Sequence, residues 1–453
     1  MATVAAMLRH QGCEVSGSDQ DVYPPMSDFL AAEGIPTLSG YHPAHISADL
    51  DLVVVGNAIS RGNPELEELL DRKIRYCSLP EVIREHFLWG ARSVVIAGTH
   101  GKTTTTSLTG WVLTAGGIDP SVLVGGIVRN FGEHGSSYRI GRGREFVIEG
   151  DEYDSAFFDK TAKFLKYVPD IAVINNVEFD HADIYADLAA VSLAFRRLVN
   201  LVPRRGLLIL GADSEGARAL IGAAVSRVET FGLGEEVDWQ AHDLESSGPL
   251  MRFRVRRGGS PFGTFEAPLV GAHNVRNALA AIAVATDAGM GVEQIARGLR
   301  SFAGVKRRLE VVGVADGVTI YDDFAHHPTA VAETLAGLRT AHPSARVWAV
   351  FEPRSASSCR RVFQEDFARA FAAADRVVVA PVFRSTLPEA ERLSVSKLVR
   401  DLDDRGLWAR EADSIEDIIT AIVREHRAGD LVVIMSNGGF GGIHQKLLRA
   451  LSS

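Results

Sequence analysis

Residues 97–106, AGTHGKTTTT, have the composition of a loop that holds phosphate. The apolar run SVVIAG leads into them and a helix-forming segment follows, so backbone N–H groups and a positive helix end would converge on one point. Lys102 can reach the β- and γ-phosphates of a nucleotide, and the hydroxyl of Thr103 suits Mg²⁺. The common phosphate-loop pattern has glycine where this chain has Ile96. A plain glycine turn is the alternative, but the strand–loop–helix order favours the phosphate loop.

Two acidic clusters follow strand-like runs. In FVIEGDEYDS, Glu149 ends an apolar run and further carboxylates follow, which repel one another unless a cation or basic group shares the site. In NNVEFDHADIY, His181 lies among Glu178, Asp180 and Asp183, an oxygen-rich setting that favours Mg²⁺. A solvated acidic loop and a structural histidine are the respective alternatives.

An amide pair and a basic cluster come next. Asn274 and Asn277 are three apart, so on a helix they share a face and could contact an adenine edge, although asparagine at a helix start is often only a cap. In GVKRRLE, Arg308 could stabilise charge on a transferring phosphoryl group. By spacing alone, a solvated basic turn would explain that segment equally well.

Further polar groups follow strand-like runs near the C-terminus. YDDFAHHPTAV contains Asp323, His326 and His327, and FEPRS contains Arg354 and Ser355. Strand ends of one parallel sheet collect ligands, so these groups could bind an acceptor. Ordinary surface histidines are the alternative.

The elements that must position these groups alternate along the chain. Short apolar runs are separated by helical stretches, which predicts parallel α/β layers of the doubly wound kind. A length of 453 residues accommodates three domains, and we place them at 1–91, 92–308 and 309–453. The stretch from 226 to 268 is polar, glycine-rich and predicted to be β-rich.

Charge and composition exclude several classes of protein. The net charge of −9 gives no electrostatic reason to expect nucleic acid or an anionic membrane as a partner. Three scattered cysteines fit a reducing cytoplasm and argue against a disulfide framework. No apolar run approaches the ~20 residues that span a bilayer. We therefore expect a cytoplasmic protein without a membrane segment.

Taken in order, GTHGKTTT, EGDEYDS, NNVEFDHADIY, GAHNVRNALAA, KRRLE and DDFAHHPTAV resemble the Mur ligase family, the ATP-dependent amide-forming enzymes of peptidoglycan synthesis. The similarity covers nearly the whole chain, and the family's shortened phosphate loop makes Ile96 no defect. It implies three domains: a Rossmann-like UDP-binding domain, a P-loop ATPase-type central domain and a Rossmann-like C-terminal domain. It also implies ATP and Mg²⁺ as cofactors.

The resemblance assigns roles by position. The residues expected at ATP are Gly98, Thr99, His100, Gly101, Lys102, Thr103, Thr104, Asn274, Asn277, Arg308 and Asp323. The expected metal ligands are Thr103, Glu149 and His181, and the expected catalytic residues are Lys102, Glu149, His181 and Arg308. The expected acceptor-side residues are His326, His327, Arg354 and Ser355. The segment ADLAAVSLAFRRLVN lacks lysine, so we predict no carbamylated lysine.

Within the family, the His-His-Pro turn marks the two branches that use UDP-N-acetylmuramate. The chain is more similar to the branch that adds the recycled tripeptide L-Ala-γ-D-Glu-meso-diaminopimelate than to the branch that adds L-alanine, which stays the alternative. One departure is Ala356-Ser357, where the tripeptide branch often has Asn-Thr. The implied reaction passes through an acyl phosphate. We expect the protein to be a monomer or a weak homo-oligomer. A P-loop switch and a folylpolyglutamate synthetase are more distant alternatives.

The start of the chain differs from that of the relatives. They begin with a strand and a glycine-rich turn, whereas this sequence begins at the helix that follows. The remaining donor-nucleotide loops would be SGSD, with Ser16 and Asp19, and NAISRGNPE, with Asn57 and Ser60. Either the start codon is placed too far downstream or the domain is trimmed; in a trimmed domain we expect an exposed sheet edge and weakened UDP-sugar binding.

Overall fold

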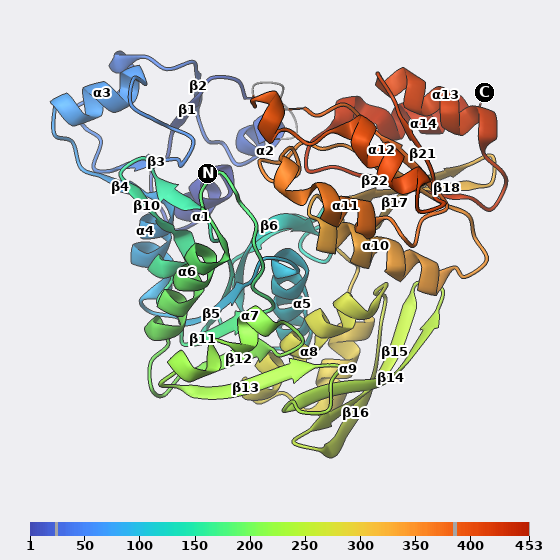
Figure 1. The fold of residues 1–453 in the computed structure, drawn as a ribbon. Coiled ribbons are helices and arrows are strands. Elements are labelled where there is room, and N and C mark those ends of the chain that lie inside the picture. The colour runs from blue at the N-terminus through green and yellow to red at the C-terminus, as the bar shows by residue number, and fades with distance from the viewer. Residues whose placement is uncertain (23–25, 384–386, 453) are drawn as a thin grey trace.

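The computed structural model describes residues 1–22, 26–383 and 387–452, and it contains three successive α/β units (Figure 1). The doubly wound, three-part architecture predicted above is confirmed, and the domain boundaries stay predictions. None of the helices in these described ranges is long and apolar enough to cross a membrane.

The first unit has its strands in two separate pairs. β1 is parallel to β2, β3 is parallel to β4, and no strand within the described ranges joins the two pairs. Ser16 immediately precedes β1, whose hydrogen-bonded register with β2 begins at Gly17. The elements are α1 (Ala2–His10), β1 (Gly17–Asp19), α2 (Met26–Ala32), β2 (Thr37–Ser39), β3 (Val53–Val55), α3 (Pro64–Asp71), β4 (Tyr76–Ser78) and α4 (Leu79–Ile83), followed by a π-helical turn (Arg84–Leu88).

A ten-stranded sheet forms the second unit, in the order β16-β15-β14-β13-β12-β11-β5-β8-β6-β7. Its strands are β5 (Arg92–Ala97), β6 (Ser121–Val128), β7 (Ser136–Arg139), β8 (Glu145–Gly150), β11 (Ile171–Ile174), β12 (Leu207–Gly211), β13 (Arg227–Gly232), β14 (Trp239–Ser247), β15 (Leu250–Arg257) and β16 (Ser260–Ala267). A small pair, β9 (Asp154–Ala156) and β10 (Asp159–Ala162), lies apart from it. The helices are α5 (Lys102–Ala115), α6 (Leu188–Leu201), α7 (Glu215–Arg218), α8 (Ala272–Asp287) and α9 (Val292–Arg300).

Both faces of this sheet are buried, which explains why its central strands are continuously apolar. Val94 and Ile96 of β5 pack with α5, α8 and α9, whereas Val95 and Ala97 pack with α6 and with α1 and α4 of the first unit. Successive side chains of a strand point to opposite faces, so a strand covered on both sides must be apolar throughout. The phosphate loop follows β5 directly and is therefore anchored on the core.

The third unit has a six-stranded sheet in the order β17-β18-β22-β19-β20-β21, parallel except for β17 (Figure 1). Helices α10, α11 and α12 cover one face, and α13 and α14 cover the other. The strands are β17 (Glu310–Ala315), β18 (Val318–Asp323), β19 (Val347–Phe351), β20 (Arg376–Val379), β21 (Trp408–Glu411) and β22 (Leu431–Met435). The helices are α10 (Pro328–Ala341), α11 (Gln364–Ala370), α12 (Val395–Asp403), α13 (Ile415–Glu425) and α14 (Ile443–Leu451).

Candidate active site

The phosphate loop is a tight turn between β5 and α5 that two glycines make possible. Gly98 and Gly101 have φ values of 134° and 79°, a backbone conformation that residues other than glycine rarely adopt. A Cβ on Gly101 would lie 2.5 Å from Oδ1 of Asn277, and one on Gly98 would lie 3.0 Å from the backbone nitrogen of Asn175. The loop is thus packed closely against Asn175, which follows β11, and Asn277 of α8, and the rest of its backbone can face a ligand.

Lys102, the first residue of α5, is held back over the loop. Its Nζ donates to the carbonyl oxygens of Gly98 at 2.7 Å and Thr99 at 3.2 Å, and it lies 3.0 Å from Oε2 of Glu152. Burial disfavours the charge on Lys102, but the neighbouring carboxylates outweigh it and raise the pKa of Lys102. The site therefore keeps a fixed cation where a polyphosphate would lie.

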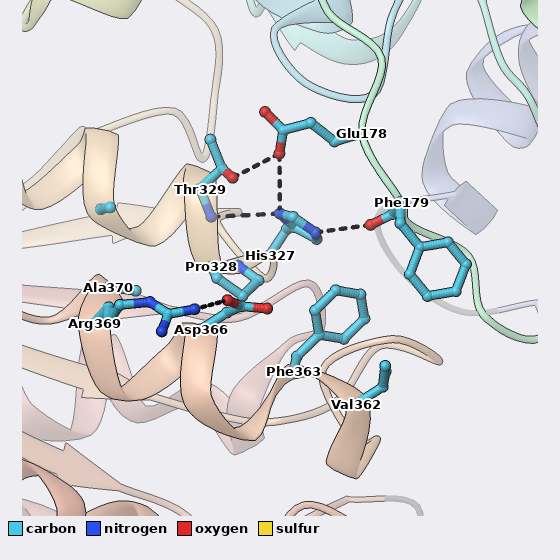
Figure 2. Close-up of a pocket in the computed structure, with 11 residues that line it drawn as sticks. Glu178, Phe179, His327, Pro328, Thr329, Val362, Phe363, Asp366, Arg369 and Ala370 are labelled. Atoms are coloured by element: carbon cyan, nitrogen blue, oxygen red, sulfur yellow. Dashed lines mark hydrogen bonds and ion pairs between the residues drawn. The ribbon is translucent and has the colours of Figure 1, made fainter. Parts of the chain in front are cut away.

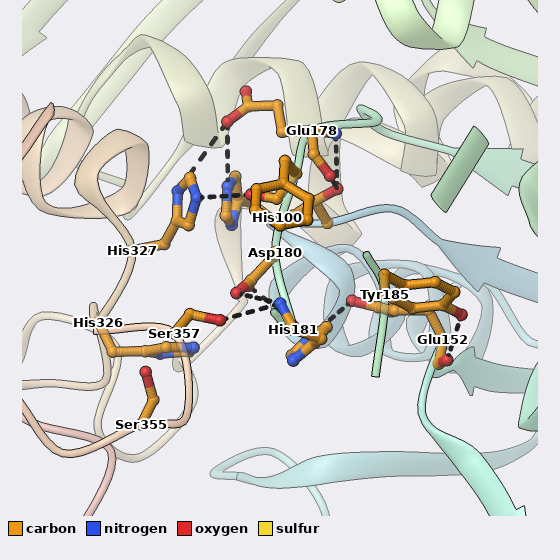
Figure 3. Close-up of polar contacts among 12 residues, drawn as sticks. His100, Glu152, Glu178, Asp180, His181, Tyr185, His326, His327, Ser355 and Ser357 are labelled. Carbon is orange, nitrogen blue, oxygen red and sulfur yellow. Dashed lines mark hydrogen bonds and ion pairs between the residues drawn. The ribbon is translucent and has the colours of Figure 1, made fainter. Parts of the chain in front are cut away.

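Glu152 joins this lysine to His181. Its Oε1 lies 2.9 Å from Nε2 of His181, and the hydroxyl of Tyr185 donates to its backbone carbonyl at 2.7 Å (Figure 3). Burial works against the charge of Glu152, yet Lys102 and His181 lower the pKa of its carboxyl group. Burial likewise opposes the charge of His181, and the bond to Glu152 raises the pKa of the imidazole. The sequence indicated an acidic cluster here, but not that Glu152 connects the two groups.

A second polar group surrounds Thr103. The hydroxyl of Thr103 donates to Oε1 of Glu149 at 2.8 Å, and the backbone N–H of Gly125 donates to Oε2 at 2.6 Å. Arg308 reaches across from the end of the second unit and donates from Nη2 to the Thr103 hydroxyl at 3.1 Å. Burial, with the charge of Asp151, raises the pKa of Glu149. A hydroxyl and a carboxylate side by side are hard oxygen donors of the kind that Mg²⁺ takes.

The three predicted metal ligands are divided between these two groups. Thr103 and Glu149 contact each other, while His181 contacts Glu152 and lies near Asp180. The oxygen pair fits a hard cation beside the phosphate loop, so the predicted ligand set stays a proposal with Thr103 and Glu149 as its better supported members.

Asn274 and Asn277 share a face of α8, as their spacing predicted. Nδ2 of Asn277 donates to Oδ1 of Asn274 at 3.0 Å, and Oδ1 of Asn277 accepts from the hydroxyl of Thr105 at 3.0 Å. Asn175, which sequence reasoning did not single out, donates to the same hydroxyl at 2.9 Å. This amide network fixes α5 against α8 behind the loop, a role that only the tertiary contacts reveal.

On the third unit, two of the predicted residues are engaged in local turns. Asp323 is buried and accepts from the backbone N–H groups of Leu309 at 2.7 Å and Ala325 at 2.8 Å. Burial raises the pKa of this carboxyl group. The hydroxyl of Ser355 accepts from the backbone N–H of Ser358 at 2.9 Å. Both residues shape the loops at the strand ends.

Arg354 is the more open group in that region. Its guanidinium carbon lies 3.6 Å from the ring centroid of Phe383, and Nη1 lies 3.5 Å from the carboxylate of Glu352. A Cβ on Gly438 would lie 2.0 Å from Nε of Arg354, so glycine there makes room for the guanidinium. Nothing in the sequence alone connected these two loops.

The second and third units meet beside the phosphate loop. The hydroxyl of Ser357 accepts from the backbone N–H of His181 at 2.9 Å, and Nε2 of His327 lies 3.1 Å from the carbonyl oxygen of Phe179. His326 lies near Ser355 and Ser357 (Figure 3). The departure noted at Ala356-Ser357 therefore has a structural use, because Ser357 contacts the loop that carries His181.

The proposed donor loops lie on the surface of the first unit. Asp19 ends β1, while Asn57 and Ser60 follow β3, and all three are exposed. A Cβ on Gly56 would lie 3.6 Å from Cγ of Met1, so the start of α1 lies against the end of β3.

Comparison with known proteins agrees with this architecture. The Mur ligase family catalytic domain model matches residues 1–88, the Mur ligase middle domain matches 96–285, and the Mur ligase glutamate ligase domain matches 307–438. The chain belongs to the Mur ligase family, whose members are ATP-dependent ligases that form amide bonds. The resemblance stated from the sequence is confirmed.

Two relatives and one solved structure define its position in the family. The chain is 39% identical over 453 residues to the UDP-N-acetylmuramate--L-alanyl-gamma-D-glutamyl-meso-2,6-diaminoheptandioate ligase of Escherichia coli, covering 100% of this chain and 96% of that protein. It is 33% identical to a UDP-N-acetylmuramate--L-alanine ligase of Desulforapulum autotrophicum, with the same two coverages. The crystal structure of a murein peptide ligase from Psychrobacter arcticus superposes with a TM-score of 0.72 at 35% identity, covering 100% of this chain and 96% of that chain.

Proposed function

We propose that this protein is the ligase that joins UDP-N-acetylmuramate to the recycled tripeptide L-Ala-γ-D-Glu-meso-diaminopimelate, through an acyl phosphate and at the expense of ATP. The observation that carries the proposal is the position of Lys102, held between two loop carbonyls and Glu152, with Arg308 on the adjacent Thr103. We further propose that it acts in the cytoplasm during peptidoglycan recycling, as a monomer or weak homo-oligomer.

The activation step needs charge neutralisation and alignment more than acid–base chemistry. The lactyl carboxylate of the donor attacks the γ-phosphorus of ATP, and ADP leaves. Lys102 and Arg308 offset the negative charge on the phosphoryl oxygens, and the backbone N–H groups of residues 98–102 orient the phosphate chain. Because both cations are already fixed by hydrogen bonds, little reorganisation is required at the moment of transfer.

In the second step the alanine amine of the tripeptide attacks the acyl carbonyl, the amide bond forms and phosphate leaves. The third unit would present this peptide, with Arg354 available to bind one of its carboxylates bidentately. His326 and His327 lie on the same side, at the start of α10. Contacts such as Ser357 to His181 bring the acceptor side next to the phosphate loop.

Magnesium fits the donors of this site. Thr103 and Glu149 would hold it, with His181 as a further ligand, and the ion would supply charge neutralisation at the phosphates. The adenine would lie toward Asn274 and Asn277, whose amides here contact each other. Asp19, Asn57 and Ser60 would contact the UDP moiety.

The alternative substrate is L-alanine, as in the second branch that shares the His-His-Pro turn. Identity of 39% to a tripeptide ligase against 33% to an alanine ligase favours the tripeptide. The guanidinium of Arg354, stacked on Phe383 and accommodated by Gly438, also favours an acceptor with several carboxylates.

A substrate panel tests the proposal. Phosphate release would be measured with ATP, Mg²⁺ and UDP-N-acetylmuramate in the presence of L-alanine, the dipeptide or the tripeptide, and compared as kcat/KM. We expect kcat/KM for the tripeptide to exceed that for L-alanine by about 10⁴-fold or more, the discrimination expected when polar groups of a site are left unpaired. A higher value for L-alanine would assign the chain to the other branch. Release from ATP alone would reject the ligase and favour a nucleotide switch.

A further inference from the structure

Three side chains that could bind a metal lie close together where the second and third units meet. None of them is among the proposed magnesium ligands. His100 lies in the phosphate loop, Glu178 follows β11, and His327 is the N-cap of α10. Oε2 of Glu178 lies 3.3 Å from Nε2 of His100 and 4.0 Å from Nδ1 of His327, and one ligand atom of each lies within 4.8 Å of the others. The ring centroids of His100 and His327 are 4.5 Å apart. Figure 3 shows the two imidazole rings side by side beneath Glu178. We propose that His100, Glu178 and His327 form a site for a transition-metal ion of the Zn²⁺ class that joins the second and third units.

The donor set selects the kind of metal. Two imidazoles and one carboxylate suit Zn²⁺, which binds His₂Glu sets and leaves a position for water, whereas Mg²⁺ prefers oxygen donors throughout. Tetrahedral coordination at about 2.1 Å places neighbouring ligand atoms roughly 3.4 Å apart. The separation between His100 and Glu178 already matches that spacing, and Nδ1 of His327, now 4.0 Å from Oε2 of Glu178, would have to come about 0.6 Å closer to that oxygen.

Neighbouring residues hold the side chains of His327 and Glu178 by hydrogen bonds, as the outer partners of metal ligands do. Nε2 of His327 lies 3.1 Å from the carbonyl oxygen of Phe179, which can only accept, so that nitrogen carries the proton and Nδ1 is the acceptor of the ring. Nδ1 now accepts the backbone N–H of Thr329 at 3.4 Å, and a metal bound there would replace this long N-cap bond. The hydroxyl of Thr329 donates to Oε2 of Glu178 at 2.6 Å. Metal-bound imidazoles and carboxylates characteristically have such outer partners.

The protonation states also suit a metal. Burial lowers the pKa of His327 to about 3, so its ring is neutral near pH 7. Burial alone would raise the pKa of Glu178, but its hydrogen-bond partners, His100 first, lower it to about 2. A metal bound at Nε2 of His100 would take the place of the hydrogen bond that this nitrogen makes to Glu178. A neutral imidazole and an ionised carboxylate are the forms that bind metals.

An ion can reach the site from a cavity. A cavity of about 430 Å³ lies between the two units and is lined by Glu178, Phe179, His327, Thr329, Phe363 and Arg369, among others (Figure 2). The side chain of Glu178 is 35% exposed, whereas those of His100 and His327 are 11% and 6% exposed. The ion would therefore enter past the carboxylate and meet the two buried nitrogens.

A metal here would hold the two units in the arrangement seen in the structure and fix His100 within the phosphate loop. Inhibition of turnover by Zn²⁺ is the expected consequence, and that consequence rests on the proposed ligase function. Metal binding does not rest on it, because the ligands are residues of the protein alone.

The test measures metal binding to the full chain without substrates. Protein freed of metal by a chelator would be titrated with Co²⁺ in excess Mg²⁺, so that the oxygen donors at Thr103 and Glu149 are occupied. We expect one Co²⁺ per chain, with visible d–d absorption that Zn²⁺ abolishes, and a higher Tm with Zn²⁺. His327→Ala and Glu178→Gln should each weaken the affinity by about 100-fold or more, since loss of a direct ligand exceeds the roughly 10- to 100-fold cost of losing an outer partner. His342→Ala, at the other end of α10, is the matched control and should bind as the wild type does.

His327→Cys provides a readout that a purely structural histidine would not give. It should retain Co²⁺ and add a sulfur-to-cobalt charge-transfer band, and it keeps the test decisive if His327→Ala does not fold. Absence of saturable Co²⁺ binding would overturn the proposal. So would unchanged affinity in His327→Ala and Glu178→Gln, or a loss of affinity confined to Glu152→Gln, which would put the metal at His181.

Discussion

Nζ of Lys102 lies 3.0 Å from Oε2 of Glu152, and both side chains are almost completely buried. A buried ammonium group needs a fixed partner of opposite charge, and Glu152 is that partner here. Glu152 also contacts His181, so the carboxylate is itself held in place beside the lysine.

Removing that carboxylate charge should affect both stability and turnover. Glu152→Gln leaves Lys102 without its buried counter-ion, so we expect the free energy of unfolding to fall by about 3 kcal/mol. kcat should fall because the lysine is no longer positioned. Chemical denaturation and phosphate release would measure the two effects. The control is Asp154→Asn, whose partner Lys160 is 66% exposed; it should change stability by less than about 1 kcal/mol.

Arg308 is expected to act mainly on the transfer step. Arg308→Ala removes the guanidinium that contacts Thr103, so kcat should fall by about 100-fold or more, with a smaller change in the KM for ATP. Steady-state kinetics at varied ATP would separate the two constants. The neighbouring Lys306→Ala removes an exposed charge and should leave kcat within about twofold. Equal losses in the two variants would speak for a general charge effect.

Gly438 should control the acceptor through Arg354. In Gly438→Ala the new Cβ would lie 2.0 Å from Nε of Arg354, and the flexible guanidinium would move away. We expect kcat/KM for the tripeptide to fall about tenfold or more, since a bidentate contact is lost, with the KM for ATP unchanged. Gly439→Ala is the matched control, because a Cβ there has no neighbour within 4 Å among the described residues. A rise in the KM for ATP in Gly438→Ala would contradict this reasoning.

The buried His327 should make stability depend on pH. Burial lowers the pKa of His327 from 6.5 to about 3, so between these values the unfolded chain binds a proton that the native chain does not. The contribution to stability is therefore complete above about pH 6.5 and is lost as the pH falls toward 3. Denaturation at several pH values in a chelator would measure it. His327→Gln cannot titrate and should show a flatter profile over this range; identical profiles would exclude His327 as the cause.

The sequence by itself determined most of the architecture. Continuous apolar runs such as residues 93–98 had to become strands buried on both faces, and the glycines at 98 and 101 had to form the turn before α5. Local rules fix such features, because strand burial and positive φ leave few other residue types suitable. The face shared by Asn274 and Asn277 followed from helical spacing in the same way.

Tertiary structure decided which of these groups meet. Glu152 with His181, Gly438 with Arg354, and Glu178 with His100 and His327 are each separated by at least 29 positions in the chain or come from different units. No local periodicity encodes such pairs, since they depend on the order of strands and on how the third unit packs against the second. The sequence therefore specified the phosphate loop and the residue types around it, while the packing of sheets decided their partners, their protonation and the shape of the acceptor side.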